Sequence, residues 1–284
     1  MKITEYPTAQ FFDENDVLIK DGTNGTKQIK ASDMVYALFD GIPEMHRQIY
    51  RGKNLGPTFT AAQKEAISSG TFHDLWIGDY WVISDNTYLI ADFDSYYGMG
   101  DTKCMTHHAN IVPNTLIGST FAYSTSDGDP TKLYGNSTFR TTMKNQVSST
   151  INAAFPDSIL SYRDFLHVSC DQGAGVTDGS KNWNVSSQWF DCDIELMSVE
   201  MIVGNVKPGP IRISSLIPTR TQLPLFSLKP QLAIIDGKNT NYWTRSPSSE
   251  SPRNYCIEIT ITGNAMSEPG QSLHYARPFF LIKG

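Results

Sequence analysis

The apolar and polar positions of this chain follow helical spacing in two stretches. One apolar residue in every four places a continuous stripe on one face of residues 141–155. Thr60 and Gln63 have the spacing of a capping box, in which the two side chains satisfy free amides at a helix start. We therefore expect one helix over 141–155 and another from Thr60 to about Ser68, ending before Gly70. The apolar stripe consists of Met143, Val147, Ile151 and Phe155.

Other stretches have the composition and period of β-strands. Residues 76–83 and 88–93 are rich in β-forming residues on either side of a polar turn at residues 84–86, which predicts a hairpin. From Trp189 onwards, acidic and apolar residues alternate, which predicts a strand with carboxylates on one face. The alternating residues are Asp191, Asp193 and Glu195 on one face and Cys192, Ile194 and Leu196 on the other. Further strands are expected at Ile211–Ser214, Gln231–Ile235, Tyr255–Thr262 and Ala276–Ile282. Two helices, many short strands and long loops predict an α+β fold.

The first 45 residues form a unit of their own in this interpretation. A strand at Val17–Ile19 and a turn at Asp21 and Gly22 precede a short helix, for which Ser32 is the expected N-cap. The helix has apolar residues at helical spacing and ends before Gly41. Such a unit is too small to bury its own apolar face, so residues 1–45 are predicted to anchor or oligomerise the protein. The alternative is an extension packed on its own main domain, residues 46–284.

Composition limits the classes of function. The 284 residues include 11% aromatic residues, enough for one sizeable core plus an appendage. Only 18% of residues are charged and the formal net charge is −6, which argues against nucleic-acid binding through phosphate contacts. No apolar run reaches the ~20 residues that a bilayer requires. We therefore expect a soluble protein without a secretion signal and without membrane insertion.

Catalytic and metal-binding motifs are not evident in the sequence. No phosphate-binding loop, GxSxG elbow or HExxH motif occurs, and the adjacent His107 and His108 would point to opposite faces of a strand. The four cysteines are scattered without zinc-ligand spacing and are expected to be free buried thiols. They are Cys104, Cys170, Cys192 and Cys256. We predict no enzyme activity and no catalytic residue.

Two groups of acidic residues are the candidates for a metal ion. Asp92, Asp94 and Asp101 surround a Tyr- and Gly-rich loop, and the second group is the acidic face of residues 191–195. Calcium takes six to eight oxygen ligands from flexible loops, but neither group has the EF-hand spacing, and a row of acids on a strand is more often a solvated face. The preferred prediction is therefore no cofactor and no metal, with calcium as the alternative.

Residues 239–255 carry the predicted ligand-binding surface. Tyr, Trp and Arg dominate recognition surfaces because they offer large contact areas at modest entropic cost. The Pro- and Ser-rich surroundings favour exposure of Arg245, whereas Trp243 and Tyr255 have the equally weighted alternative of filling the core. The predicted ligand-binding residues are Asn239, Asn241, Tyr242, Trp243, Arg245, Ser248, Arg253, Asn254 and Tyr255.

Two segments of the C-terminal region resemble a known family. Tyr-Trp-Thr-Arg-Ser-Pro at 242–247, followed by Tyr-Ala-Arg-Pro at 275–278, is similar to the C-terminal pattern of C-type-lectin-like domains in bacterial and phage proteins. Related folds include phage tropism determinants and formylglycine-generating enzymes. The resemblance implies a C-type-lectin-like fold for residues 46–284. It does not imply the enzymatic activity, because neither Cys192 nor Cys256 has a matching sequence context.

Three further segments resemble phage proteins. Residues 70–81 and 90–94 are similar to proteins of phages and prophages of gut Firmicutes, and residues 16–29 resemble the N-terminal segment of many phage structural proteins. The resemblance implies a virion protein, made in the host cytoplasm and placed on the tail or its tip. Its partners would be a bacterial surface glycan or protein, other virion proteins and further copies of itself, with a trimer as the expected oligomer.

Three alternatives stay open at this point. The protein could be a purely structural baseplate or decoration component, without receptor binding. Its C-terminal segment could be diversified by a retroelement, as in tropism determinants. A glycan hydrolase, the third alternative, needs two carboxylates facing a cleft, and the sequence identifies no such pair.

Overall fold

The computed structural model describes residues 17–20, 27–123, 133–172, 183–204, 221–235, 240–247 and 255–284. The protein has a mixed α+β fold with mostly antiparallel sheets, which confirms the predicted fold class at this level. Its helices are α1 (Ala31–Phe39), α2 (Pro43–His46), α3 (Ala61–Ser68), α4 (Thr138–Ala154), α5 (Val199–Val203) and α6 (Pro224–Leu228), with short 3₁₀ helices η2 (Tyr134–Asn136) and η3 (Pro230–Ala233). Its strands are β1 (Val17–Lys20), β2 (Lys27–Lys30), β3 (Tyr80–Ile83), β4 (Asn86–Phe93), β5 (Ala109–Pro113), β6 (Phe121–Ala122), β7 (Tyr162–Gln172), β8 (Trp183–Cys192), β9 (Ile194–Leu196), β10 (Tyr242–Pro247), β11 (Tyr255–Ile259), β12 (Ala265–Pro269), β13 (Leu273–Ala276) and β14 (Pro278–Ile282).

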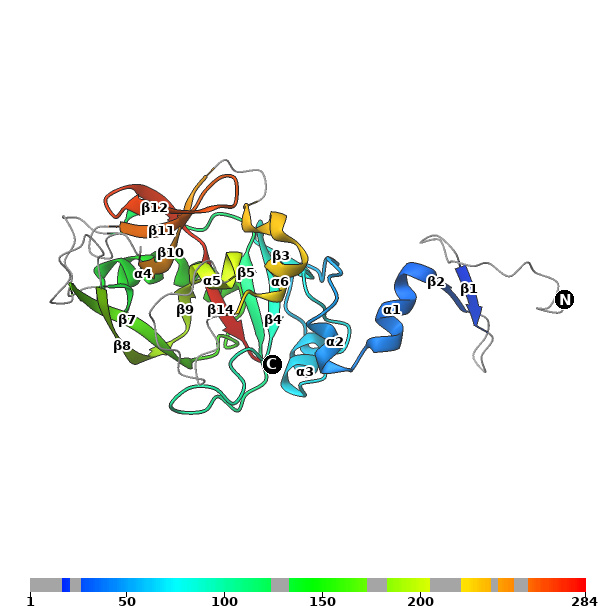
Figure 1. Cartoon of the computed structure of the whole chain (residues 1–284). Helices are drawn as coiled ribbons and strands as arrows, with labels where there is room; N and C mark the ends of the chain where they lie inside the picture. Colours follow the sequence, from blue (N-terminus) through cyan, green and yellow to red (C-terminus); the bar gives the residue numbers. More distant parts are fainter. Residues whose placement is uncertain are drawn as a thin grey trace.

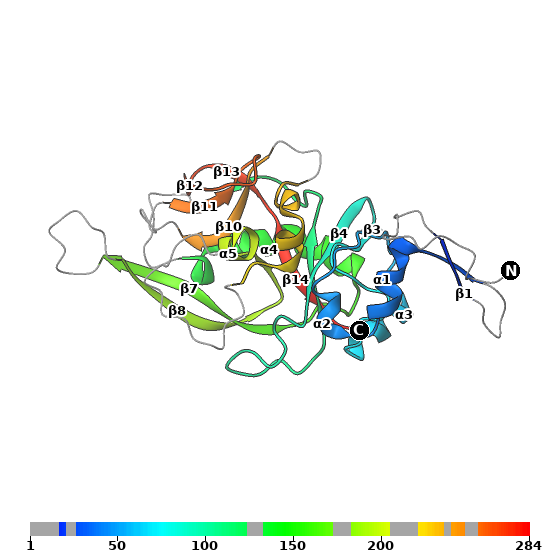
Figure 2. The same ribbon diagram turned by 45° about the vertical axis from the view of Figure 1, so that its right-hand side comes forward.

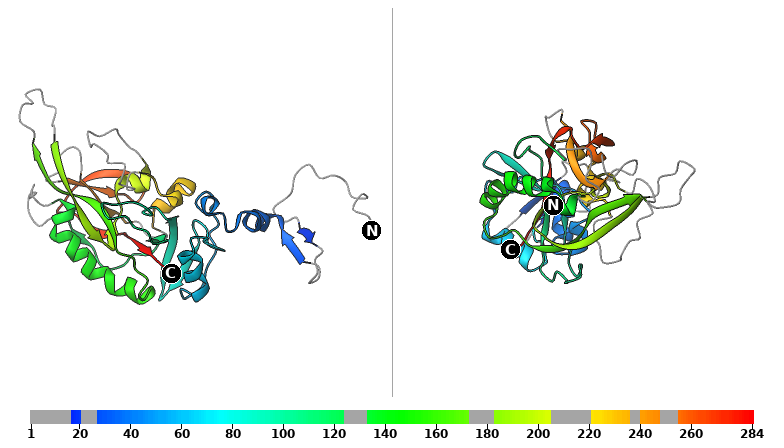
Figure 3. Two further views of the ribbon diagram at one scale, coloured as in Figure 1. Left: turned by 90° about the horizontal axis from the view of Figure 1, so that it is seen from below. Right: turned by 90° about the vertical axis from the view of Figure 1, so that its left-hand side faces the viewer.

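A five-stranded sheet forms the centre of the body. Its strand order is β3-β4-β5-β14-β9, so the last strand of the chain inserts between β5 and β9. Every residue of β14 is buried. Helix α4 lies on one side of this sheet and α5 and α6 on the other (Figure 3). The C-terminal strand is therefore part of the core rather than an appendage.

The hairpin and the two helices predicted for the main domain are present. β3 and β4 pair in antiparallel register across Ser84 and Asp85, which both have positive φ, as a two-residue hairpin turn requires. Thr60 and Gln63 form the predicted capping box at the start of α3. Helix α4 begins at Thr138, three residues earlier than predicted, because the Ser137 side chain accepts a hydrogen bond from the Arg140 amide.

The apolar stripe of α4 leads into an aromatic cluster in the core. Phe155, at the end of the helix, has four other rings with centroids within 5.1–5.7 Å. Three of the four contacts are edge-on, a geometry that favours a well-defined core because ring edges and faces carry opposite partial charges. The four rings belong to Phe59, Trp81, Tyr88 and Phe280.

A second five-stranded sheet contains most of the C-terminal region. Its order is β12-β11-β10-β13-β6, with β10 and β13 parallel and the other pairs antiparallel. The strand expected at Tyr255–Thr262 ends at Ile259, and the strand expected at Ala276–Ile282 is divided at Arg277 between β13 and β14. The strand predicted at Gln231–Ile235 is wrong, because Pro230 starts the 3₁₀ helix η3 there. The strand predicted at Ile211–Ser214 lies outside the described residues.

An N-terminal arm extends from the body. It consists of the β1–β2 hairpin and α1, and Figures 1 and 2 show it running away from the two large sheets. The predicted strand at Val17–Ile19 is present as β1, but helix α1 starts at Ala31 with Lys30 as its N-cap, so the assignment of Ser32 as N-cap is wrong. Val35 and Leu38 on α1 are exposed, which agrees with a helix too short to bury its own apolar face. The described helices include none that is long and apolar enough to cross a membrane.

The arm joins the body around a buried histidine. The His46 ring stacks on the Trp76 indole at a centroid distance of 4.2 Å. Its Nδ1 donates to the Leu75 carbonyl over 2.5 Å, and its Nε2 accepts from the Gly41 amide over 2.9 Å. This arrangement requires the neutral ring. Burial lowers the pKa of His46 and so favours that form.

Candidate functional site

The two aromatic residues at the start of β10 are core residues. The Tyr242 hydroxyl donates to the Ala233 carbonyl over 2.7 Å, and the Trp243 indole N–H donates to the Phe121 carbonyl over 3.0 Å. Both side chains are 1% exposed. Their assignment as surface contacts is therefore wrong, and for Trp243 the alternative of filling the core is the observed one.

Arg245 is also buried, which corrects the prediction of an exposed loop arginine. Its Nη1 lies 2.7 Å from Oδ2 of Asp164 on β7, and the two side chains are 6% and 0% exposed. Burial disfavours the cation, yet the Asp164 carboxylate raises the pKa of Arg245 above its usual range. The Arg245 amide donates to the Met197 carbonyl, so backbone and side chain both fix β10 in the interior. Sequence composition suggested exposure because the partner lies 81 residues away along the chain.

The remaining residues of the predicted surface divide into two groups. Asn241 is partly buried and bonded at both ends of its amide: it donates to Glu258 over 3.1 Å and accepts from the Ile261 amide over 3.0 Å. Tyr255 begins β11, but its side chain lies outside the described part of the structure. Asn239, Ser248, Arg253 and Asn254 also lie outside the described residues, so their role stays a prediction.

The second part of the sequence motif is structural as well. Arg277 is 1% exposed and directs its guanidinium at backbone carbonyls of Pro113, Leu232 and Ala233 over 2.7–3.2 Å. It also lies over the Tyr242 ring at 5.4 Å. A fork of five N–H donors suits this task, because it satisfies carbonyls of two segments at once. The motif residues Trp243, Arg245 and Arg277 thus stabilise the fold and leave recognition to other surfaces.

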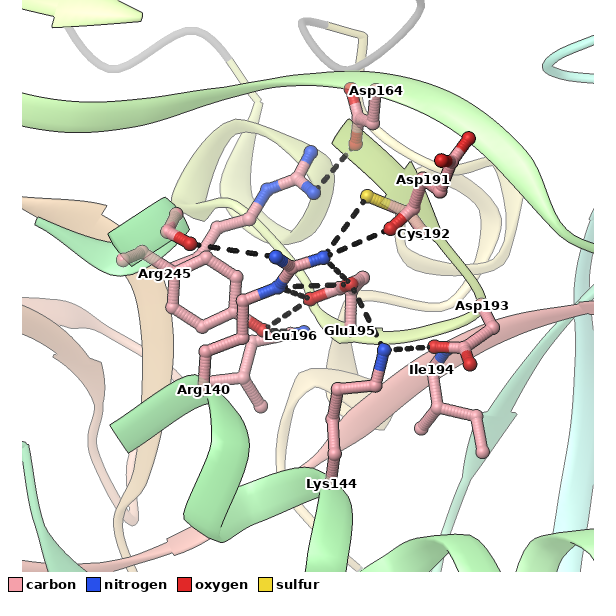
Figure 4. Close-up of polar contacts among 12 residues, drawn as sticks. Arg140, Lys144, Asp164, Asp191, Cys192, Asp193, Ile194, Glu195, Leu196 and Arg245 are labelled. Carbon is pink, nitrogen blue, oxygen red and sulfur yellow. Dashed lines mark hydrogen bonds and ion pairs between the residues drawn. The ribbon is translucent and has the colours of Figure 1, made fainter. Parts of the chain in front are cut away.

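A network of buried ion pairs holds the two-stranded ribbon β7–β8 against the body (Figure 4). Arg140 on α4 makes a forked contact with the fully buried Glu195 on β9, with N–O distances of 2.5–3.1 Å. The same guanidinium donates to the Asp191 carbonyl at the end of β8 over 3.2 Å. Burial alone would lower the pKa of Arg140, but the bonds to Glu195 raise it. Helix, strand and ribbon are therefore joined at one charged centre.

The network also satisfies the polar groups around it. The Tyr134 hydroxyl donates to Glu195 over 2.8 Å and accepts from the Leu196 amide over 2.9 Å. Lys144 on α4 pairs with Asp193. Cys192 is buried, and burial raises the pKa of its thiol. A protonated thiol is a poor nucleophile, so this cysteine is part of the packing.

The acidic residues from 191 to 195 do not share one face, which corrects the predicted single strand. The chain bends at Asp193, and this bend separates β8 from β9. Glu195 consequently points into the core, whereas the Asp191 side chain is 83% exposed. A row of three carboxylates is therefore not formed.

The other candidate metal site, the acidic residues around the Tyr- and Gly-rich loop, is not assembled, because each of its carboxylates has a different partner. Asp92 pairs with Arg47, Asp94 bonds Nδ1 of His107 over 2.6 Å, and Asp101 pairs with Arg163. The adjacent His108 is buried, with its Nδ1 donating to the Thr106 carbonyl and its Nε2 accepting from the Tyr96 amide. Among the residues that the structure describes, no group of three or more His, Cys, Asp or Glu side chains is placed to hold a metal ion. Cys104 and Cys192 are free thiols; the side chains of Cys170 and Cys256 are outside the described set.

The outer face of the ribbon carries a pair of aromatic residues that sequence analysis did not select. Phe165 on β7 is the register partner of Trp189 on β8, and their ring centroids are 5.1 Å apart. Both side chains are partly exposed. One step along the same face, Arg163 pairs with Asp191, and in the other direction His167 bonds Ser187. The signal available in the sequence was a partial alternation, in which the apolar Tyr162, Leu166 and Val168 occupy every second position, with the exception of Asp164, between Arg163, Phe165 and His167.

Comparison with known proteins identified no relative of this chain. None of the known family models, curated proteins or solved structures compared with this chain matches it.

Proposed function

We propose that this protein is a virion component of a bacteriophage that recognises the surface of a host bacterium. In this proposal the N-terminal arm attaches to the virion, and the end of the body that carries β7–β8 faces the host. The observation that carries it is the separation of these two parts: the arm leaves one end of the body, and the ribbon lies at the other (Figures 1 and 3). The phage-like segments at 16–29, 70–81 and 90–94 supply the biological setting.

We also propose that the body is a C-type-lectin-like domain. Support comes from the two helices α3 and α4, from short and mostly antiparallel strands, and from the C-terminal strand inserted in the central sheet. Trp243, Arg245 and Arg277 belong to the two segments that resemble C-type-lectin-like domains. Their burial supports this assignment, because residues that hold a fold together are expected to recur in domains that share it. Loops on such a rigid scaffold are common sites of recognition.

The proposed activity is binding rather than catalysis. The two fully buried carboxylates of the network, Asp164 and Glu195, already pair with Arg245 and Arg140. Both carboxylates therefore form ion pairs inside the protein that hold the ribbon, and neither is free to contact a substrate. A glycosidase would need carboxylates that face its substrate.

The arm supports an attached, multivalent arrangement. Val35 and Leu38 are 41% and 63% exposed on a helix that extends from the body. An isolated two-stranded hairpin such as β1–β2 is marginal in water, so contacts with the virion or with further copies of the chain would stabilise it. Multiple copies on one particle would strengthen weak individual contacts through their high effective concentration.

Binding to intact cells tests the proposal. The full-length protein, fluorescently labelled on lysines, is incubated with a panel of gut Firmicutes, and cell-bound fluorescence is measured by flow cytometry. Labelling of a subset of strains is the expected result. The heat-unfolded protein serves as the control for non-specific adhesion.

The alternative is a purely structural role as a baseplate or decoration protein. Absence of labelling on every strain, with the protein folded by circular dichroism, would contradict receptor binding and favour this alternative. Both roles require the protein to be part of the virion, which antibody labelling of phage particles in the electron microscope tests. Unlabelled particles would contradict receptor binding and the structural role alike.

A further inference from the structure

The outer face of the ribbon β7–β8 has a defined chemical pattern. Cross-strand register partners point to the same side of a two-stranded sheet, so three pairs in succession form this face. Residues at the intervening positions of β7, such as Asp164 and Leu166, are buried against the body. The three outward pairs are Arg163 with Asp191, Phe165 with Trp189, and His167 with Ser187.

The central pair offers aromatic surface at the solvent boundary. Phe165 and Trp189 lie with an interplanar angle of 52°, and both retain partial exposure. Aromatic rings bury large apolar areas and bind C–H groups with their electron-rich faces. Side chains with few rotatable bonds also lose little entropy when a ligand covers them. This pair is suited to an apolar surface of about one sugar ring.

Polar groups lie on both sides of the aromatic pair. On one side the Asp191 carboxylate is 83% exposed and receives one bond from Arg163 over 3.1 Å. On the other side the Ser187 hydroxyl and the His167 ring are bonded over 2.8 Å. From 187 to 191 the strand advances ~13 Å, about the length of two or three linked sugar rings. Hydroxyl groups at the rim of a sugar would meet these donors and acceptors.

The local charge restricts the ligand further. Arg163 lies beside the aromatic pair and is shared between Asp101 and Asp191. These three described side chains, one positive and two negative, have a net charge of −1, which disfavours an anionic polymer at this end. A neutral or amino-bearing saccharide is complementary to this charge.

We propose that the outer face of β7–β8 binds a neutral oligosaccharide of the bacterial surface, with a sugar ring stacked on Trp189 and Phe165. This inference rests on the proposed function as a host-recognition protein and names the class of receptor. Asp191 and Ser187 accept hydrogen bonds from sugar hydroxyls on either side of the rings. The inner network of Figure 4 keeps the ribbon in place.

The test uses the full-length protein and immobilised saccharides of stated composition. The neutral probes are chitotetraose, maltotetraose and a galactose tetramer, and the anionic probe is poly(glycerol phosphate). Wild-type protein is compared with Trp189→Ala and Asp191→Asn. The matched control is Tyr97→Ala, because Tyr97 is an exposed aromatic residue in contact with a neighbouring ring, that of His107, but lies in the loop between β4 and β5, away from the ribbon. Circular dichroism and thermal unfolding establish that each variant is folded.

We expect binding to at least one neutral probe, weakened about tenfold by Trp189→Ala and less by Asp191→Asn, with Tyr97→Ala unchanged. Equal binding by wild type and folded Trp189→Ala would overturn the assignment of the site. Binding to poly(glycerol phosphate) alone would overturn the charge argument. Labelling of cells without binding to any neutral saccharide would refute this inference and leave the proposed function intact, whereas loss of both would refute the two together.

Discussion

The Arg245–Asp164 pair gives the sharpest test of the structure. Both side chains are inside the protein, and the Asp164 carboxylate also accepts from the Tyr96 hydroxyl over 3.0 Å and from the Phe165 amide over 2.8 Å. Arg245→Ala removes the only cation that the described structure pairs with this carboxylate. A buried charge left without its partner costs about 3–5 kcal/mol of unfolding free energy. For a domain of this size, that loss lowers the midpoint of thermal unfolding by about 10 °C.

The assay is urea unfolding followed by tryptophan fluorescence, supported by thermal scans of circular dichroism. The double variant Arg245→Ala with Asp164→Ala removes both charges, so we expect it to be more stable than the sum of the single losses by about 2 kcal/mol. Arg163→Ala is the matched control, because Arg163 is next to Asp164 on β7 but forms its ion pairs with the solvent-accessible Asp101 and Asp191. Its effect should be small, since screened surface pairs contribute little.

The reasoning is refuted if Arg245→Ala unfolds at the same urea concentration as Arg163→Ala. That result would place Arg245 at the surface, as composition alone suggested. A large loss in Arg245→Ala without any recovery in the double variant would show that packing of the arginine stem, rather than the charge pair, supplies the stability.

Three further measurements test other parts of the fold. Gly78→Ala should cost about 1–3 kcal/mol more than Gly98→Ala, because both glycines have positive φ but only at Gly78 would the new methyl group overlap a ring, that of Tyr50. Equal melting temperatures of the two variants would contradict this. The pKa of His46 is lowered by burial from 6.5, so the native state binds fewer protons than the unfolded chain, and stability should fall as the pH decreases below about 6.5. His46→Asn should be less stable than wild type at pH 7.5, but its melting temperature should fall less steeply towards pH 5.5. A slope equal to that of wild type would exclude protonation of His46 as the cause of the pH dependence. Phe155→Ala should lose about 3–5 kcal/mol in urea unfolding, because the ring lies among four others in the core, and a loss below about 1 kcal/mol would contradict that packing.

Local sequence signals predicted the elements that depend on neighbouring residues. The capping box at Thr60, the turn at Ser84 and Asp85, and the apolar stripe of α4 each require only residues within a few positions of one another. The 3₁₀ helix at Pro230–Ala233 was predicted as a strand because an apolar run of that length has no helical or strand period of its own. Its carbonyls are used by Arg277, a contact between distant segments that a local pattern does not contain.

Residue type misled the prediction of the binding surface for a different reason. Tyr, Trp and Arg are enriched both at recognition surfaces and, when their polar atoms have partners, in protein cores. The partners of Trp243 and Arg245 are the Phe121 carbonyl and Asp164, which are 122 and 81 residues away in the sequence. Without those partners a buried location is unfavourable, so sequence alone favoured exposure for Arg245.

The ribbon illustrates how the buried and exposed parts of the site depend on each other. Phe165 follows Asp164 directly in β7, so the ion pair with Arg245 on the inner face fixes the strand that presents the outer ring. We therefore expect Arg245→Ala to reduce both stability and saccharide binding, whereas Trp189→Ala should reduce binding and leave the urea midpoint close to that of wild type. Measured on the same preparations, these two readouts separate support of the ribbon from contact with the ligand. If Arg245→Ala lowered stability but bound saccharides as tightly as wild type under native conditions, the outer face would not depend on this ion pair, and the inner and outer faces of the ribbon would not be coupled.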